Sequence, residues 1–180
     1  MARMPKEVQD VFNAVGTVTF ATATPEGQPN ACIVGMKKIL DDETIYLSDQ
    51  FFKKTLANVL ENAKVSVLFF NDDGAYQVHG TARYVNEGPE FEENAAWVNA
   101  AFAGMGLPIT AKGGVFVHVD EVYTSKSGPG AGDKIVYTMR RVLKVRAVCF
   151  FRIHPDARPR RVRRLNTGRQ VVFARSDGGV

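Results

Sequence analysis

Hydrophobic and polar positions alternate over much of the chain with the two-residue period of β-strands. The alternation predicts six strands, each bounded by Gly, Pro, Asn or Asp residues that favour turns: 17–24, 30–40, 44–48, 64–70, 75–85 and 115–123. The sequence NDDG at residues 71–74 is the strongest turn signal and predicts a hairpin. Gly80, inside the strand that follows, predicts a bulge or the close approach of another backbone. Six strands in meander order close most easily as a small barrel.

Three other segments have the spacing of apolar residues that is typical of helices. They are residues 5–15, a segment that begins at Lys53, and a segment from Gly88-Pro89 to about Phe102. In the second segment, Leu56, Val59 and Leu60 are expected to lie on the sheet. The predicted fold is therefore mainly β with helices: an antiparallel six-stranded, Greek-key-like β-barrel with three peripheral helices.

Length and composition favour one domain with a substantial core, since the chain has 180 residues and 45% hydrophobic residues. No apolar run reaches the length of a membrane span, and charged residues near the start argue against a signal peptide. Cys32 and Cys149 form no motif, so a reducing, cytoplasmic location is expected. The histidines His79, His118 and His154 lack metal-ligand spacing, so no metal site is expected.

The charge of the chain changes abruptly near Asp133-Lys134. Residues 1–134 contain 11 Lys and Arg against 17 Asp and Glu, a net charge of −6, whereas residues 135–180 contain 12 against 2, a net charge of +10. This change predicts a folded domain over 1–134 and an arginine-rich C-terminal extension over 135–180. Dense like charges resist burial, so the extension is expected to be peripheral and to lie outside any cofactor site.

Basic residues and a hydroxyl gather where the second helix begins. Lys53, Lys54 and Thr55 occupy its start, and Asn58 follows one turn later. A helix N-terminus presents unpaired N–H groups and the positive end of a dipole, so this cluster is suited to a phosphate monoester. The alternative is a solvated surface helix with incidental lysines, because short basic clusters are common.

Four strings, in this order along the chain, resemble one protein family: TPEGQPNA, SDQFFKKTLANV, FFNDDGAYQVHGTARYV and GPEFEENAAWV. They are similar to the pyridoxamine-5'-phosphate-oxidase-like, FMN-binding split-barrel superfamily. The resemblance is strongest to its small branch of FMN-binding and flavoredoxin-like proteins, and it covers roughly residues 5–130. It implies a homodimer of split β-barrels with FMN in the cleft between the subunits.

The resemblance also implies which residues bind the cofactor. The flavin phosphate would be held by Lys53, Lys54, Thr55 and Asn58, with Ser48 and Asp49 in the segment that enters this turn. The strand edge beside the flavin ring would be formed by Ala31, Cys32 and Ile33. The partner subunit would contribute the region of Trp97 and the end of the last strand, with Lys126.

The function implied by the resemblance is that of an FMN-binding flavoprotein, either an oxidoreductase or an electron carrier. Because the flavin does the redox chemistry, no nucleophile or acid–base pair is required of the protein, and no catalytic residue is assigned. Cys32 is interpreted as a small buried apolar residue, and His79 as a partly buried residue with a partner. Alternatives are a deazaflavin- or haem-using member of the same fold and a module that binds nucleic acid or another anion through its basic tail.

One departure argues against oxidation of vitamin B6. The oxidases that give the family its name have an Arg/His segment, a tryptophan and a proline motif near the C-terminus. Here Arg152-Ile153-His154 matches the first part only faintly, and Trp97 is the one tryptophan.

Overall fold

The computed structural model describes residues 3–135, which form one curled antiparallel sheet with three helices. The helices are α1 (Lys6–Ala14), α2 (Lys54–Glu61) and α3 (Pro89–Gly104). The strands are β1 (Val18–Ala23), β2 (Pro29–Val34), β3 (Lys37–Asp41), β4 (Thr44–Asp49), β5 (Lys64–Phe70), β6 (Ala75–Val85) and β7 (Gly113–Thr124). The predicted fold class is confirmed. The C-terminal extension lies outside the described residues.

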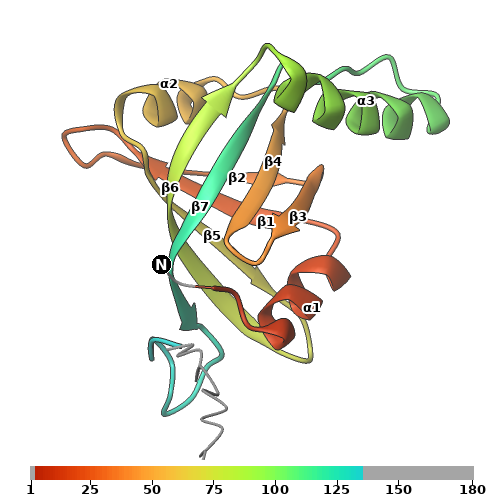
Figure 1. The fold of residues 1–180 in the computed structure, drawn as a ribbon. Helices are drawn as coiled ribbons and strands as arrows, with labels where there is room; N and C mark the ends of the chain where they lie inside the picture. Colours follow the sequence, from red (N-terminus) through yellow and green to blue (C-terminus); the bar gives the residue numbers. More distant parts are fainter. Residues whose placement is uncertain (1–2, 136–180) are drawn as a thin grey trace, which may run out of the picture. The chain divides into compact units, whose positions relative to one another are not determined.

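The sheet has seven strands, in the order β2-β1-β5-β6-β7-β4-β3 (Figure 1). The difference from the six predicted strands lies in residues 30–40, which the sequence pattern presents as one strand. They form β2, which pairs with β1 at one edge of the sheet, and β3, which pairs with β4 at the other edge. Strands that are consecutive in the sequence pair in β1-β2, β3-β4, β5-β6 and β6-β7, as a meander predicts. In addition, β1 pairs with β5 and β4 pairs with β7, which are not consecutive. The strand order of the sheet is therefore not that of a simple meander.

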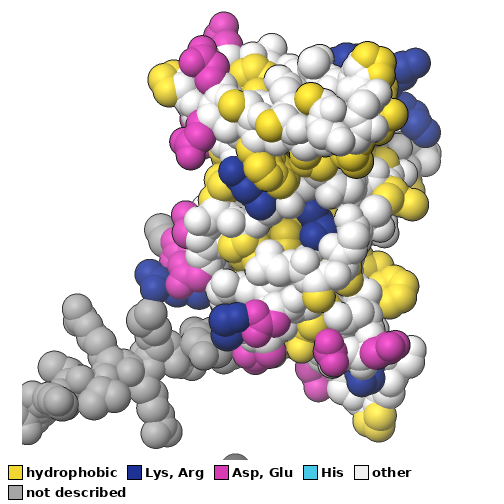
Figure 2. All heavy atoms as spheres, turned by 90° about the vertical axis from the view of Figure 1, so that its right-hand side faces the viewer, with side chains coloured by type: hydrophobic (Ala, Val, Ile, Leu, Met, Phe, Trp, Pro, Cys, Tyr) yellow, Lys and Arg dark blue, Asp and Glu magenta, His cyan; other side chains and the backbone are white. Residues whose placement is uncertain are grey.

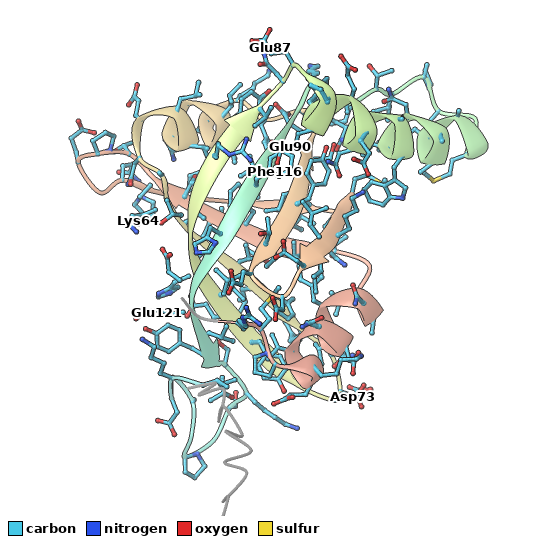
Figure 3. All side chains as sticks on the ribbon, viewed as in Figure 1. Lys64, Asp73, Glu87, Glu90, Phe116 and Glu121 are labelled. Carbon is cyan, nitrogen blue, oxygen red and sulfur yellow. The ribbon has the colours of Figure 1, made fainter. Side chains whose placement is uncertain are left out.

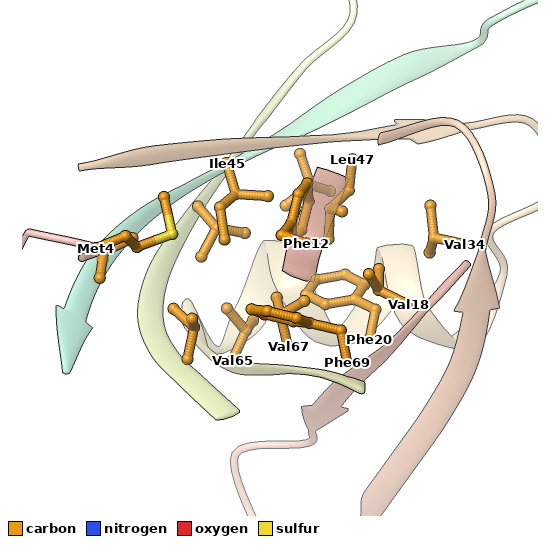
Figure 4. Packing of buried hydrophobic residues seen from close by; sticks show 14 of the residues in the cluster. Met4, Phe12, Val18, Phe20, Val34, Ile45, Leu47, Val65, Val67 and Phe69 are labelled. Carbon is orange, nitrogen blue, oxygen red and sulfur yellow. The ribbon is translucent and has the colours of Figure 1, made fainter. Parts of the chain in front are cut away.

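The core lies on the inner face of the curled sheet, where apolar side chains from most of the strands meet those of α1 (Figure 4). Phe12 of α1 is fully buried, and its ring packs edge-on against Phe69 of β5 with the ring centroids 5.2 Å apart. Lys37 reaches the end of α1, and its Nζ donates a hydrogen bond of 2.7 Å to the carbonyl of Phe12. Burial lowers the pKa of Lys37. These contacts fix α1 against β3 and β5.

The predicted irregularity at Gly80 is confirmed. The register of β6 against β7 shifts between His79 and Gly80. A Cβ atom on Gly80 would lie 2.5 Å from the backbone oxygen of His118, so the two strands approach each other too closely there for any side chain.

A second, smaller cluster holds α3. Val98 of α3 packs against Tyr46 of β4 and Phe116 of β7, and all three are buried. Large apolar side chains on and just after the helix are exposed, among them Trp97 of α3 and Met105 at its C-cap. Figure 2 shows hydrophobic side chains on this side of the molecule. Within residues 3–135, no helix combines the length and the apolar character needed to cross a membrane.

Replacement of Phe12 by alanine tests the core. Because Phe12 is fully buried, we expect the free energy of unfolding to fall by about 3–5 kcal/mol in chemical denaturation. The matched control is Phe51→Ala, since Phe51 is 71% exposed and its loss should change stability by less than about 0.5 kcal/mol. Equal losses for the two variants would contradict the assignment of Phe12 to the core.

Candidate functional site

The start of α2 presents positive charge and unpaired backbone groups to the solvent. Lys53 occupies the N-cap position and makes no side-chain capping hydrogen bond, and the first turn of the helix contains no acidic residue. The side chains of Lys53 and Lys54 are both exposed. The first N–H groups of a helix have no partner within the helix, and the helix dipole adds partial positive charge. This arrangement can therefore bind an anion.

The turn that leads into α2 is held from inside by Asp49, the last residue of β4. Asp49 is 1% exposed, and its carboxylate accepts hydrogen bonds from the Phe52 backbone N–H (2.7 Å) and the Tyr84 hydroxyl (3.1 Å). Its backbone oxygen accepts a bond of 2.8 Å from the N–H of Lys112. Ser48 is equally buried, and its hydroxyl accepts a bond of 2.6 Å from the Gln50 amide. Both residues thus lie at the predicted site and are bonded to the protein itself.

The position of Tyr84 beside Asp49 has an electrostatic consequence. Burial first, and then the nearby Asp49 carboxylate, raises the pKa of Tyr84 to about 12. A Cβ atom on Gly113 would collide with the Tyr84 hydroxyl, so any side chain where β7 begins would displace Tyr84 from its place beside Asp49. The turn is therefore tied to β6 and β7 as well as to β4.

The opposite side of α2 is bonded to β1 and β2 through polar side chains. Thr55 and Asn58 are 4% and 5% exposed, so both predicted ligands face the protein interior. The Asn30 amide nitrogen donates to the hydroxyl oxygens of Thr55 (3.0 Å) and Thr22 (3.2 Å). The Asn58 amide donates to the same Thr22 oxygen at 3.0 Å. Asn30 and Thr22 are not among the predicted site residues; their only sequence signal is a polar residue at an inward-facing strand position.

These bonds correct the predicted apolar face of α2. Leu60 is 66% exposed, whereas the side chains toward the sheet include Thr55, Asn58 and the buried Val59. Near the end of the helix, the Asn62 amide donates to the carbonyl of Ala23 at 3.2 Å. The helix therefore contacts the sheet through a largely polar stripe.

The predicted ring-binding edge is β2, which is the outermost strand on its side of the sheet. Ala31 and Ile33 point outward, and Ile33 is 74% exposed. Cys32 points inward, where its sulfur accepts a hydrogen bond of 3.4 Å from the Thr55 hydroxyl. Burial raises the pKa of the Cys32 thiol, and the charge of Asp49 adds to this effect, although the Thr55 bond opposes it. An edge strand leaves alternate backbone N–H and C=O groups unpaired, and these can bond to a flat polar ligand.

The remaining two predicted residues lie on other elements. Trp97 of α3 is 38% exposed, with the Lys38 Nζ 4.9 Å from its ring centroid. Lys126 follows the end of β7, whereas Asp49 pairs with Gly113 at the start of that strand. The whole length of β7 thus separates Lys126 from the start of α2 (Figure 1). Lys126 instead borders a hollow of about 640 Å³ together with Leu68, Phe70 and Gln77.

A second hollow, of about 710 Å³, lies over β1, β5, β6 and β7 and was not predicted. Its lining includes the small residues Ala21 and Ser66. Two side-chain pairs border it: the ion pair of Lys64 with Asp120 at 3.2 Å, and the Nδ1 atom of His79 at 3.9 Å from the Glu121 carboxylate. Figure 3 shows Lys64 and Glu121 on the same side of the sheet. Lys64 and Asp120 also bond to Thr81, and Glu121 bonds to Tyr123 and Lys134, so the hollow has a polar rim.

The described residues form a mainly β fold of the split-barrel class, with an uncapped helix start beside an edge strand. Comparison with known proteins specifies the family: residues 4–125 match the model of the pyridoxamine 5'-phosphate oxidase family, and the chain belongs to it. The uncharacterized protein MJ0282 of Methanocaldococcus jannaschii is 40% identical over 121 residues, which are 66% of this chain and 78% of that protein.

Solved structures of related fold support this assignment. HupZ from Group A Streptococcus is 24% identical with a TM-score of 0.60, over 72% of this chain and 99% of that chain. An FMN-binding protein from Syntrophomonas wolfei is 17% identical with a TM-score of 0.55, over 65% and 82% of the two chains. An F420 reductase and the heme storage protein HutZ from Vibrio cholerae have the same fold with TM-scores of 0.51, and they cover 66% and 68% of this chain at 15% identity. At this identity the solved structures establish the fold and not the ligand.

Replacement of Tyr84 by phenylalanine tests the bond to Asp49. Near neutral pH we expect the variant to lose about 1.5–3 kcal/mol of unfolding free energy, the range for a hydrogen bond to a charged group. The pKa of Tyr84 is raised on folding, so its contribution is complete below the unfolded value of about 10 and is lost as the pH rises through about 12. The difference between wild type and variant should therefore shrink over this interval.

The measurement is denaturant unfolding at several pH values, with Tyr76→Phe as the control. Tyr76 lies on the same strand, β6, and packs against Phe69. A difference between wild type and Tyr84→Phe that stays constant with pH would contradict the coupling of Tyr84 to Asp49.

Proposed function

We propose that this protein binds FMN and acts as a flavin-dependent oxidoreductase or electron carrier. The observation that carries the proposal is the uncapped start of α2, with the exposed Lys53 and Lys54, next to the free edge strand β2 in a chain of this family. FMN has a dianionic phosphate at one end and a flat ring with polar edges at the other. The start of α2 suits the phosphate, and the edge of β2 suits the ring.

The phosphate end would be held by charge and by backbone donors. Lys53 and Lys54 supply two ammonium groups, and the first turn of α2 supplies N–H groups that point toward the same place. Hydrogen bonds between ionised partners are roughly twice as strong as neutral ones, which favours a phosphate over an uncharged alcohol at this position. The buried Asp49 keeps the turn in place from behind.

The ring end would lie along β2. The outward side chains of Ala31 and Ile33 offer an apolar surface, and unpaired backbone groups of the strand can bond to the polar edge of the ring. When bound, FMN supplies the electron chemistry. The protein's own contribution is to orient the ring, to limit its contact with water and to tune it through backbone donors.

The partner subunit would complete the site. Lys126 lies at the far end of β7 from the start of α2 within one subunit, and large apolar side chains such as Trp97 and Phe70 are exposed. A homodimer would bring the end of β7 of one copy, with Lys126, against the ring held by the other. The same contact would cover exposed apolar surface.

Replacement of Lys53 and Lys54 by alanine tests the phosphate role. We expect the affinity for FMN to fall about tenfold or more, while the affinity for riboflavin, which lacks the phosphate, stays nearly unchanged. Thr55 is left in place because its hydroxyl is bonded inside the protein. Lys6→Ala is the control, since Lys6 is equally exposed and lies on α1. Titration calorimetry gives all the affinities, and equal losses for both ligands would exclude the phosphate role.

The absorbance spectrum of the purified protein identifies the chromophore. A flavin spectrum supports the proposal, whereas a deazaflavin or a haem spectrum would replace FMN by the ligand named for one of the structural neighbours. A protein that is colourless and binds none of the three when they are added would contradict the proposal.

Light scattering tests the assembly. We expect the mass of a homodimer, because the ring site is complete only when a second copy contributes to it. The variant Lys126→Ala should stay dimeric and bind FMN more weakly. If a monomeric fraction bound FMN as tightly as a dimeric fraction does, the shared site would be contradicted.

A further inference from the structure

We infer that Asn30 is a positioning residue that fixes the distance between the phosphate end and the ring end of the cofactor site. This inference rests on the proposed function. Asn30 belongs to β2, the strand proposed to lie along the ring, and it bonds directly to α2, the helix proposed to bind the phosphate.

The bonds of Asn30 use both protons of its amide nitrogen. One goes to Thr55 on the first turn of α2, at 3.0 Å, and the other to Thr22 on β1, at 3.2 Å. The Thr22 oxygen also accepts the bond of 3.0 Å from Asn58, one turn further along α2. One side chain therefore joins β1, β2 and α2.

The bonds of Asn30 lie in a largely buried environment. Thr22, Thr55 and Asn58 are each 4–5% exposed, so water competes weakly for their polar atoms. The one proton of the Thr55 hydroxyl is directed to the Cys32 sulfur, which is the next inward-facing residue of β2 after Asn30. Thr55 is thus bonded to the same strand twice. Because its side chain is enclosed, we assign Thr55 the role of holding α2 against β2, and the proposed anion contacts are those of Lys53 and Lys54.

This geometry matters for a ligand with two ends. FMN gains affinity over its parts only if the phosphate and the ring can reach their sites together. If α2 can shift relative to β2, each end still finds its own site, but the two sites no longer match one rigid ligand. Loss of the Asn30 bonds should therefore weaken FMN selectively, without weakening either part of the molecule.

The experiment compares three ligands on the full-length protein by calorimetry: FMN, riboflavin and inorganic phosphate. For Asn30→Ala we expect the FMN affinity to fall about tenfold or more, whereas the affinities for riboflavin and for phosphate stay near those of wild type. The control is Asn62→Ala, which removes an asparagine bonded to Ala23 at the far end of α2 and should leave the FMN affinity unchanged.

A second pair of variants keeps the test valid if Asn30→Ala does not fold. Thr55→Val removes the hydroxyl that receives the Asn30 bond and should repeat the selective loss, and Thr55→Ser keeps the hydroxyl and should restore binding. If riboflavin and phosphate weaken together with FMN, or if FMN is unaffected, the positioning role is excluded. If phosphate alone weakens together with FMN, Asn30 or Thr55 contacts the anion directly and the inference is also excluded. If wild type binds no FMN, the proposed function itself fails, and the inference fails with it.

Discussion

The structure depends on a constraint of chain connectivity at Gly35-Met36. Strands β2 and β3 lie at opposite edges of a seven-stranded sheet, yet they follow each other in the sequence. In a flat sheet the two edges would be about 29 Å apart, at about 4.8 Å for each pair of neighbours. Three peptide units from Val34 to Lys37 can span at most about 11 Å. The sheet must therefore curl until its edges nearly meet, which creates the interior that the core side chains fill.

The same curling determines how the start of α2 is supported. The helix begins directly after β4 and packs against β1, β2 and β6, so it is held from two sides. On one side Asp49 and Tyr84 bond the turn to β4 and β6, and on the other Asn30 and Thr22 bond the helix to β2 and β1. Both sets of bonds lie inside the protein. The lysines that carry the charge are left free to face an anion, and the backbone around them is fixed in advance, which reduces the entropy lost on binding.

Much of the fold could be predicted because its signals are local. The NDDG turn, the apolar run of β5, the alternation in β6 and the glycine at position 80 are signals within short segments of the sequence, and each was found. The division of residues 30–40 could not be seen, because both halves alternate as strands do, and only the pairing of distant strands shows where one ends. The sheet-facing side of α2 was predicted only in part for a related reason: Val59 is buried as expected, and Leu60 is not. Its leucines suggested an apolar face, but a polar stripe finds partners on β1 and β2, and Leu60 is left exposed.

The candidate site was predictable only in part for the same physical reason. Lys53 and Lys54 carry their signal in the sequence, since a charge at a helix start acts without help from distant residues. Asn30 has no such signal, because an asparagine in a strand becomes important only when folding brings two threonine hydroxyls to its amide. Thr55 and Asn58 show the converse: the family resemblance marks them as residues of the site, and the structure encloses their side chains. Residues of this kind would act on a ligand only through the geometry that they impose. Their effect depends on the size of the ligand, because only a ligand long enough to reach both α2 and β2 is sensitive to the distance between them.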